Sequence, residues 1–116
     1  MMTINEWSDA TAMAQAVQNK TVSPRELVEA TIRESERTNP KINAIVSQRY
    51  EKALKEAETR DFSEKPFAGV PIFLKDLGQE QAGEPSTAGS RLFTSYHETE
   101  TDNYVKKFEE LGFIIL

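Results

Sequence analysis

The sequence predicts an α/β fold, in which an N-terminal helical hairpin precedes a small mixed or parallel sheet with flanking helices. Three observations support this class: a helix-start signal at residues 23–26, an amphipathic helical pattern over residues 50–57, and two short apolar runs separated by a long irregular stretch. We expect residues 8–38 to form the hairpin and residues 42–116 to form the α/β part. The chain has 116 residues, close to the commonest domain size, so we expect one domain.

The stretch from Gly69 to Asp76 is the element around which the rest of the predicted fold is organised. It is mostly apolar and has turn residues at both ends, which is typical of a strand covered on both faces. Pro71 suits the start of such a strand, where a missing N–H is tolerated. We therefore predict a strand over Val70–Leu74, followed by Lys75 at its carboxyl end, where open α/β sheets place their ligand crevice.

Lys75 has two interpretations at this position. Against apolar walls, a lysine loses its proton near neutral pH because desolvation disfavours the ammonium, and it is then a candidate base. Alternatively, Lys75 is a solvated residue at a strand end, and the neighbouring Asp76 shares the same solvent. Taken alone, the octapeptide favours the solvated interpretation.

Two helices are predicted before this strand. The first runs from about Asp9 to Gln18 with Ser8 as its N-cap, because alanines and a one-sided apolar pattern favour a helix there. The turn at residues 19–22 separates it from the second helix. Two helices joined by a short turn form a hairpin, which we interpret as a packing element.

The second helix has the clearest start signal in the chain. Ser23 is its N-cap, Pro24 occupies the first helical position, and Glu26 completes a capping box. We expect the helix to end at about Arg37, because the residue before Pro40 is disfavoured in the α region. Its predicted buried face consists of Leu27, Val28, Thr31 and Ile32.

The middle of the chain suggests a strand–helix–strand unit. Residues 42–47 are a short strand candidate, although their alternation is imperfect. An amphipathic surface helix follows, because residues 50, 53, 54 and 57 are apolar and lie on one face. With the strand at Val70–Leu74, this order predicts a βαβ unit and a parallel strand pair.

A long irregular stretch over residues 76–101 is rich in Gly, Ser, Thr and Pro. Loops of this length in compact domains are usually either functional or disordered, and the sequence leaves both alternatives open. His97 is the only histidine of the chain, and it has no Ser–His–Asp set to complete. We therefore expect a solvent-facing loop residue at this position.

The last predicted elements are a helix over residues 102–111 and a buried strand over Phe113–Leu116. The helix has an apolar stripe, and Gly112 fits a C′ cap. A chain that stops inside an apolar strand leaves an unprotected edge. We therefore expect residues 1–116 to be a single truncated segment of a longer fold.

Composition excludes several classes of function. The net charge of −5 gives no electrostatic basis for binding nucleic acid or an anionic membrane. The absence of cysteine excludes disulfides, thiolate metal sites and cysteine nucleophiles, and it fits a cytoplasmic location. The first seven residues have no signal-peptide pattern, and no apolar run reaches the roughly 18 residues of a membrane span.

Four segments occur in the same order as in the amidase signature family, which the chain resembles over essentially its whole length. They are residues 39–44, Gly69–Asp76, Thr87–Ser90 and Leu111–Leu116. The second followed by the third is the most specific part of the resemblance. The family includes bacterial amidases, fatty acid amide hydrolase and the amidase-type subunit of glutamyl-tRNA amidotransferase.

The resemblance implies a Ser–Ser–Lys mechanism of amide hydrolysis without a cofactor or metal. One serine attacks the amide carbonyl, a bridging serine relays the proton, and a lysine accepts it. Lys75 is similar to that lysine, and it is the one catalytic residue we predict. Both family serines come after the last strand found here, so this chain lacks them. Ser86 and Ser90 match neither serine motif, and we assign them no catalytic role.

Two hypotheses follow. The first is that the chain is the N-terminal part of an amidase-type amidohydrolase, inactive alone, which acts on a small-molecule amide only in the complete enzyme. The second is a non-catalytic interaction module that docks through an exposed sheet edge, either onto another copy as a homo-oligomer or onto the remaining part of an amidase. An unrelated small α/β ligand-binding domain is a weaker third hypothesis, because the chain lacks a phosphate-binding or dinucleotide fingerprint.

Overall fold

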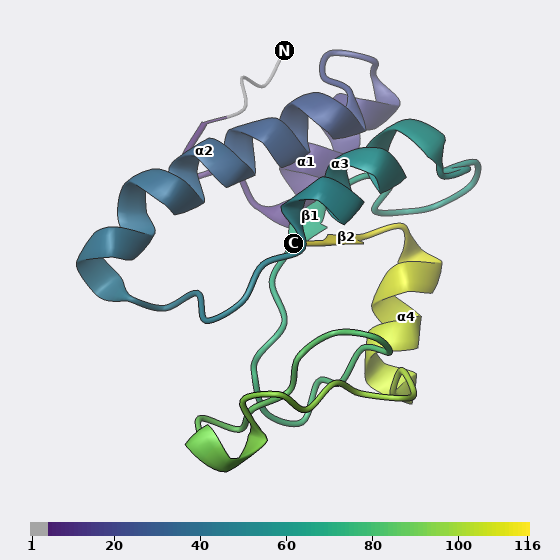
Figure 1. Cartoon of the computed structure of the whole chain (residues 1–116). Helices are drawn as coiled ribbons and strands as arrows, with labels where there is room; N and C mark the ends of the chain where they lie inside the picture. Colours follow the sequence, from purple (N-terminus) through teal and green to yellow (C-terminus); the bar gives the residue numbers. More distant parts are fainter. Residues whose placement is uncertain (1–4) are drawn as a thin grey trace.

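The computed structural model describes residues 5–116, which fold into helices around a two-stranded sheet (Figure 1). Helices α1, α2 and α3 lie together on one side of the sheet in this view, whereas α4 and the long loop lie on the other. None of the helices in the described residues is long and apolar enough to cross a membrane. The elements are α1 (Ala10–Gln18), α2 (Pro24–Ile42), α3 (Tyr50–Thr59), β1 (Pro71–Ile72), the 3₁₀ turn η1 (Arg91–Phe93), α4 (Asn103–Leu111) and β2 (Ile114–Ile115).

Helix α1 lies where the sequence predicts it, but its N-cap is Asp9 and not Ser8. The Asp9 carboxylate accepts the Ala12 N–H at 2.8 Å. The Ser8 hydroxyl instead accepts the Asn5 N–H at 2.9 Å, so it is engaged in the turn that precedes the helix. Ser8 and Asp9 are both residue types that cap helices. Because the Ser8 hydroxyl is bonded to Asn5, the cap is formed by Asp9.

Helix α2 begins with the predicted capping box but runs five residues past its predicted end at Arg37, to Ile42. Pro40 lies inside the last turn, where a missing N–H removes only one bond of the helix. Asn43 closes the helix in the left-handed conformation and donates its N–H to the Asn39 carbonyl at 2.7 Å. The expectation that Asn39-Pro40 ends the helix is therefore wrong.

Residues 42–47 do not form the predicted strand, because Ile42 belongs to α2 and the following residues pair with no strand. The Asn39 side chain takes the place of a strand partner for Ile45. Its Oδ1 accepts the Ile45 N–H at 2.8 Å, and its Nδ2 donates to the Ile45 carbonyl at 3.3 Å. The Asn39 side chain thus supplies hydrogen-bond partners for the Ile45 N–H and carbonyl, which the sequence pattern assigns to a sheet.

A parallel strand pair exists, but it joins β1 to β2 and not residues 42–47 to β1. Helix α4 lies in the connection between the two strands, directly before β2. Pro71 lies opposite Ile114, and Ile72 lies opposite Ile115. The Ile114 N–H donates to the Val70 carbonyl at 2.9 Å, and the Leu116 N–H donates to the Ile72 carbonyl at 3.0 Å. Only Pro71 and Ile72 of the predicted strand at Val70–Leu74 form a ladder, so Phe73 onward leaves the sheet.

The core lies between α2, α3 and β2. Its buried cluster consists of Val28, Ala53, Ala57, Ile114 and Leu116. The predicted buried run over Phe113–Leu116 is confirmed, since each of its residues is buried. Burying this run holds the carboxyl ends of both strands in a fixed position beneath the helices.

Helix α4 matches the prediction at both ends. The Asp102 carboxylate caps its start by accepting the Val105 N–H at 2.8 Å. Gly112 ends it at φ 103°, and a Cβ there would lie 2.7 Å from Lys65 Cβ. The sharp turn that only glycine allows directs the chain from α4 straight into β2.

Candidate active site

A cavity of about 560 Å³ opens at the carboxyl ends of the two strands. Its walls come from residues 44–49 before α3, the segment Phe73–Leu77 after β1, the loop around residues 79–89, and the end of β2. Lys75 and Asp76 both line it. The structure therefore places the predicted lysine three residues beyond the end of β1, beside the loop that follows Asp76.

The Lys75 side chain is exposed, which agrees with the solvated interpretation of the sequence and not with the interpretation that places apolar walls around it. Its backbone N–H donates to the Gln79 Oε1 at 2.8 Å. The burial that would favour a neutral amine is not supplied by residues 5–116, because Lys75 lies on an open wall of the cavity. Lys75 thus lies on the cavity wall just beyond β1, but the desolvation of its amine is not observed.

Asp76 does not simply share the solvent with Lys75. Its Oδ1 accepts the Thr87 N–H at 2.7 Å, and its Oδ2 accepts the Thr87 hydroxyl. The hydroxyl bond of Thr87, together with the backbone amides of residues 87–89, outweighs the effect of burial and holds the pKa of Asp76 below its usual range. The carboxylate therefore joins the strand end to the segment Thr87–Ser90.

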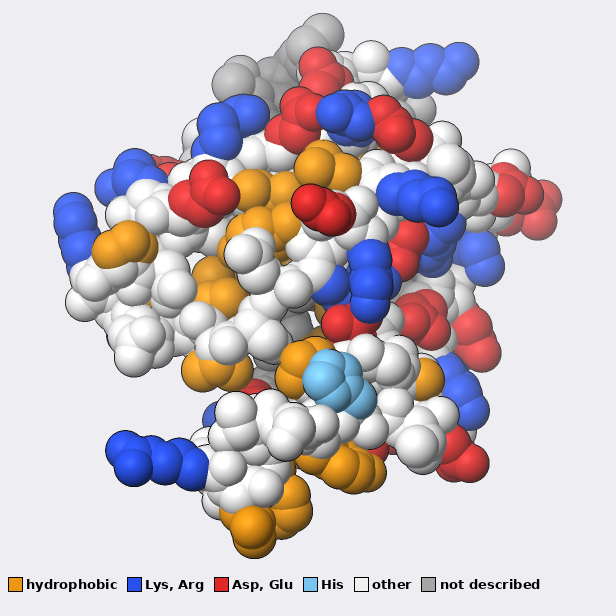
Figure 2. Space-filling view, viewed as in Figure 1, with side chains coloured by type: hydrophobic (Ala, Val, Ile, Leu, Met, Phe, Trp, Pro, Cys, Tyr) orange, Lys and Arg blue, Asp and Glu red, His pale blue; other side chains and the backbone are white. Residues whose placement is uncertain are grey.

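The irregular stretch is folded rather than disordered, which resolves one alternative that the sequence leaves open. The Gly83 N–H donates to the Glu98 carbonyl at 2.8 Å, and the Glu98 N–H donates to the Glu84 carbonyl at 3.0 Å. His97 forms an antiparallel bridge with Pro85, and its side chain is exposed as predicted (Figure 2). This pairing holds residues 84–89 against the mouth of the cavity.

Ser90, one of the two serines of this loop that match neither family motif, is engaged in local hydrogen bonds. The Ser90 hydroxyl accepts the Leu92 N–H at 3.2 Å and caps η1. The Ser90 N–H donates to the Thr87 carbonyl at 2.8 Å, which closes a turn over Thr87–Ser90. Among the residues that line the cavity, the only serine is Ser47, and no described hydrogen bond joins its hydroxyl to a general base.

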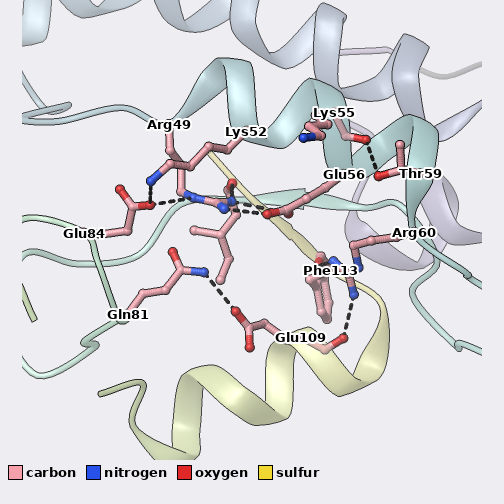
Figure 3. A network of polar contacts seen from close by, with 11 residues as sticks. Arg49, Lys52, Lys55, Glu56, Thr59, Arg60, Gln81, Glu84, Glu109 and Phe113 are labelled. Atoms are coloured by element: carbon pink, nitrogen blue, oxygen red, sulfur yellow. Dashed lines mark hydrogen bonds and ion pairs between the residues drawn. The ribbon is translucent and has the colours of Figure 1, made fainter. Parts of the chain in front are cut away.

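Arg49 forms an ion-pair cluster on the opposite wall, which the sequence analysis did not detect (Figure 3). Its guanidinium donates to Glu56 at 2.5 Å and to Glu84 at 3.3 Å, and Lys52 also binds Glu84. The Arg49 side chain is only 10% exposed. The cluster fastens the loop at Glu84 to helix α3, so the two sides of the cavity are joined by charge.

The cluster shifts the ionisation of its members. Burial opposes the charged form of Glu84, but the hydrogen bond and charge of Lys52 and the charge of Arg49 outweigh it, so the pKa of Glu84 lies below its usual range. Burial likewise opposes the charge of Arg49, yet its bond to Glu56 and the nearby carboxylates raise its pKa. Both groups therefore remain charged at neutral pH.

Two arginines also cover the outer edge of β2. Arg49 donates to the Ile115 carbonyl at 2.6 Å, and Arg60 donates to the Phe113 carbonyl at 2.8 Å. In a parallel strand these alternate carbonyls face away from β1. The edge of β2 is thus capped by side chains, whereas β1 has no second strand neighbour in residues 5–116.

Apolar side chains remain exposed beside the cavity. Val46 is 68% exposed, Leu77 is 61% exposed and Phe73 is 40% exposed, and all three line the cavity. Figure 2 shows hydrophobic side chains along the hollow between the helical part and the loop. A group of this kind around an open site is typical of a surface that another element covers.

The amidase family profile matches residues 26–116 of this chain. The chain is 37% identical to 6-aminohexanoate-cyclic-dimer hydrolase of Paenarthrobacter ureafaciens, an alignment that covers 100% of this chain and 23% of the relative. It is also 37% identical to a lipoamidase of Enterococcus faecalis, over 96% of this chain and 16% of the relative. The chain therefore spans less than a quarter of the length of these relatives.

Solved structures agree with this comparison. A 6-aminohexanoate cyclic dimer hydrolase complexed with its substrate superposes with a TM-score of 0.88 at 36% identity, covering 97% of this chain and 23% of that chain. A bacterial aryl acylamidase of the amidase signature family gives 0.85 at 30% identity, over 95% of this chain and 24% of that chain. In sequence and in fold, the chain belongs to the amidase signature family and corresponds to a fragment of its larger enzymes.

Proposed function

We propose that residues 1–116 form a single N-terminal unit of an amidase-type amidohydrolase and carry its lysine base, Lys75. The observation that supports this most directly is the position of Lys75 just beyond the carboxyl end of β1, on the wall of an open cavity. Ligand sites of α/β sheets lie at such strand ends. Family membership supplies the reaction class, which is hydrolysis of a carbon–nitrogen amide bond.

In the proposed reaction, the nucleophilic serine transfers its proton to a bridging serine as it attacks the amide carbonyl. The bridging serine passes its own proton to the neutral amine of Lys75. The leaving amine then takes a proton back along the same route as its bond to the acyl carbon breaks, and water hydrolyses the acyl-enzyme. Lys75 is therefore both the final acceptor and the source of the returned proton.

The two serines belong to the part of the enzyme that these 116 residues do not contain. We infer that this part packs against the exposed apolar side chains around the cavity, including Val46, Phe73 and Leu77. Such packing would exclude water from Lys75 and favour the neutral amine that a base requires. The substrate we propose is a small amide, in line with the activities named for the relatives.

A fusion protein tests this function. In it, residues 1–116 replace the N-terminal 23% of the Paenarthrobacter hydrolase, which is the matched part. We expect the fusion protein to hydrolyse the 6-aminohexanoate cyclic dimer, and we expect the 116-residue chain alone to give no turnover, because it has no serine nucleophile. Steady hydrolysis by the chain alone on a panel of amides would contradict the proposal. A folded but inactive fusion protein would also contradict it.

A second candidate function is that of a non-catalytic interaction module, and the unpaired edge of β1 favours it. Because Arg49 and Arg60 cap the β2 edge, β1 is the edge through which another copy would pair. This candidate predicts that the apparent mass of the chain rises with concentration in light scattering. A mass that remains monomeric across a hundredfold concentration range would eliminate self-association through this edge.

A further inference from the structure

Asp76 binds the loop opposite it through more than one group. The Thr87 N–H donates to Oδ1 at 2.7 Å, and the Thr87 hydroxyl donates to Oδ2. The backbone amides of Ala88 and Gly89 also stabilise the charged carboxylate. The Gly89 N–H additionally donates to the Thr87 hydroxyl oxygen at 3.2 Å. Thr87 therefore binds the carboxylate through two groups, and the next two backbone amides favour its charged form.

The backbone of this segment explains how it can do so. Ala88 has φ 49° and Gly89 has φ 70°, so two consecutive residues adopt the left-handed conformation. Successive N–H groups in such turns point to the same side and form an anion-binding concavity. Alanine is rarely found at positive φ, because its Cβ approaches the carbonyl oxygen. The bonds to Asp76 offset this strain.

Lys75 depends on these bonds for its position, since the strand ladder does not reach it. Regular pairing ends at Ile72, and residues 73–78 run free of the sheet. The Lys75 N–H donates to Gln79 at 2.8 Å, and the next residue, Asp76, is fastened to Thr87. These two contacts lie on either side of the Lys75 peptide, and they hold it on the cavity wall.

We propose that Asp76 is a positioning residue, whose carboxylate latches the segment Thr87–Gly89 to the end of β1 and thereby fixes the backbone that presents Lys75. The proposal rests on the proposed role of Lys75 as the base. Asp76 does not touch the reacting atoms in this scheme. It acts through the main chain of its neighbour and through the loop that forms the facing wall.

The latch has a defined pH dependence. The other charged groups on this cavity are Lys75, Arg49 and Glu84, and the last two are paired with each other. The bond from the Thr87 hydroxyl is the largest cause of the lowered pKa of Asp76, and the loop amides add to it. Because the folded pKa is depressed, the latch is fully formed above the ordinary aspartate value of about 3.9 and is lost as the pH falls through the folded value.

Nuclear magnetic resonance of the isotopically labelled 116-residue chain tests the latch directly. We expect the amide shifts of Thr87, Ala88 and Gly89 to titrate together, with one midpoint below about pH 3.9. In Asp76→Asn this shared titration disappears. In Asp76→Ala the Lys75 amide exchanges with solvent at least about tenfold faster, because a local opening becomes easier. Amide shifts that still titrate together in Asp76→Asn would overturn the proposal, and so would unchanged Lys75 exchange in Asp76→Ala.

Matched variants separate the latch from general destabilisation. Thr87→Val loses the hydroxyl donor and should accelerate the exchange of the Lys75 amide. Thr87→Ser keeps the donor, so its Lys75 amide should exchange at the original rate. The control is Asp61→Asn. The Asp61 carboxylate accepts the Ser63 N–H at 2.9 Å but does not line the cavity, so its removal should leave the exchange rate of the Lys75 amide unchanged. Equal exchange in Thr87→Val and Thr87→Ser would count against the latch even if Asp76→Ala does not fold.

These measurements need no turnover, so their outcome is independent of the proposed function. An inactive fusion protein with an intact shared titration would overturn the function and leave the latch standing. If the activity of the fusion protein requires Lys75 but the amides of Thr87, Ala88 and Gly89 titrate separately, only the latch is overturned.

Discussion

Replacing Lys75 with alanine in the fusion protein is expected to lower the turnover number by roughly 1000-fold or more, because removing a member of a proton-relay set eliminates most of the chemical acceleration. The binding of substrate depends on other groups, so KM should change much less. The measurement is steady-state hydrolysis of the 6-aminohexanoate cyclic dimer, with circular dichroism to show that the variant is folded. The loss should exceed that of any other lysine replacement.

Two control variants sharpen this prediction. Lys75→Arg keeps a positive charge, but a guanidinium stays protonated at all accessible pH values and cannot accept a proton, so we expect it to be inactive as well. Lys106→Ala changes an exposed lysine on α4 that does not line the cavity, and it should leave turnover unchanged. If Lys75→Ala retains more than a tenth of the activity, Lys75 is not the base.

Replacing Arg49 with methionine is expected to lower the free energy of unfolding of the 116-residue chain by about 2–3 kcal/mol. Breaking a buried ion pair by removing one partner costs roughly 3–5 kcal/mol, and the partial exposure of the two glutamates reduces this. Glu56 is 30% exposed and Glu84 is 18% exposed. The Ile115 carbonyl also loses its donor. Urea denaturation of the two chains measures the difference.

The matched control is Arg37→Met. Arg37 pairs with Glu34 at 2.5 Å, the same distance as the Arg49–Glu56 pair, but its side chain is 63% exposed. Exposed pairs contribute little, so we expect a much smaller loss than in Arg49→Met. The double variant Arg49→Met with Glu56→Gln should be more stable than Arg49→Met alone, because it no longer buries an unpaired carboxylate. Equal losses in Arg37→Met and Arg49→Met would contradict the argument from burial.

The local elements follow closely from the sequence wherever a short-range signal decides them. The capping box at Ser23 and Glu26 is visible in the sequence, as is the Asp102–Gly112 helix with its closing glycine. These signals lie within four residues of the groups they satisfy, so no tertiary information is needed. The errors occur where a local preference meets a distant or alternative partner.

Pro40 and residues 42–47 illustrate such errors. The rule for residues before proline correctly describes an isolated chain, but Asn43 in the left-handed conformation and the Asn39–Ile45 bonds stabilise a longer helix. The same Asn39 side chain removes the need of Ile45 for a strand partner. The apolar pattern of residues 42–47 therefore reflects local turn chemistry and not membership of a sheet.

The candidate site divides in the same way. Lys75 could be found because it directly follows an apolar run, a pattern visible within eight residues. The contact of Asp76 with Thr87 spans 11 positions, and Arg49 reaches Glu84 and Ile115 across 35 and 66 positions. An acidic residue after a strand and a Thr-x-Gly turn are visible separately, but no periodicity connects them.

By itself, the sequence determined the helices, the two apolar runs that pair, and the identity of the lysine at the end of one of them. Hydrophobic periodicity and capping residues act over a few positions, and they suffice for those features. The tertiary structure alone decided which strands are neighbours, which carboxylates are paired, and that Lys75 remains open to solvent in these residues. Those outcomes depend on which distant groups meet when the core around Ile114 is buried, since contact between them is a property of the packed chain.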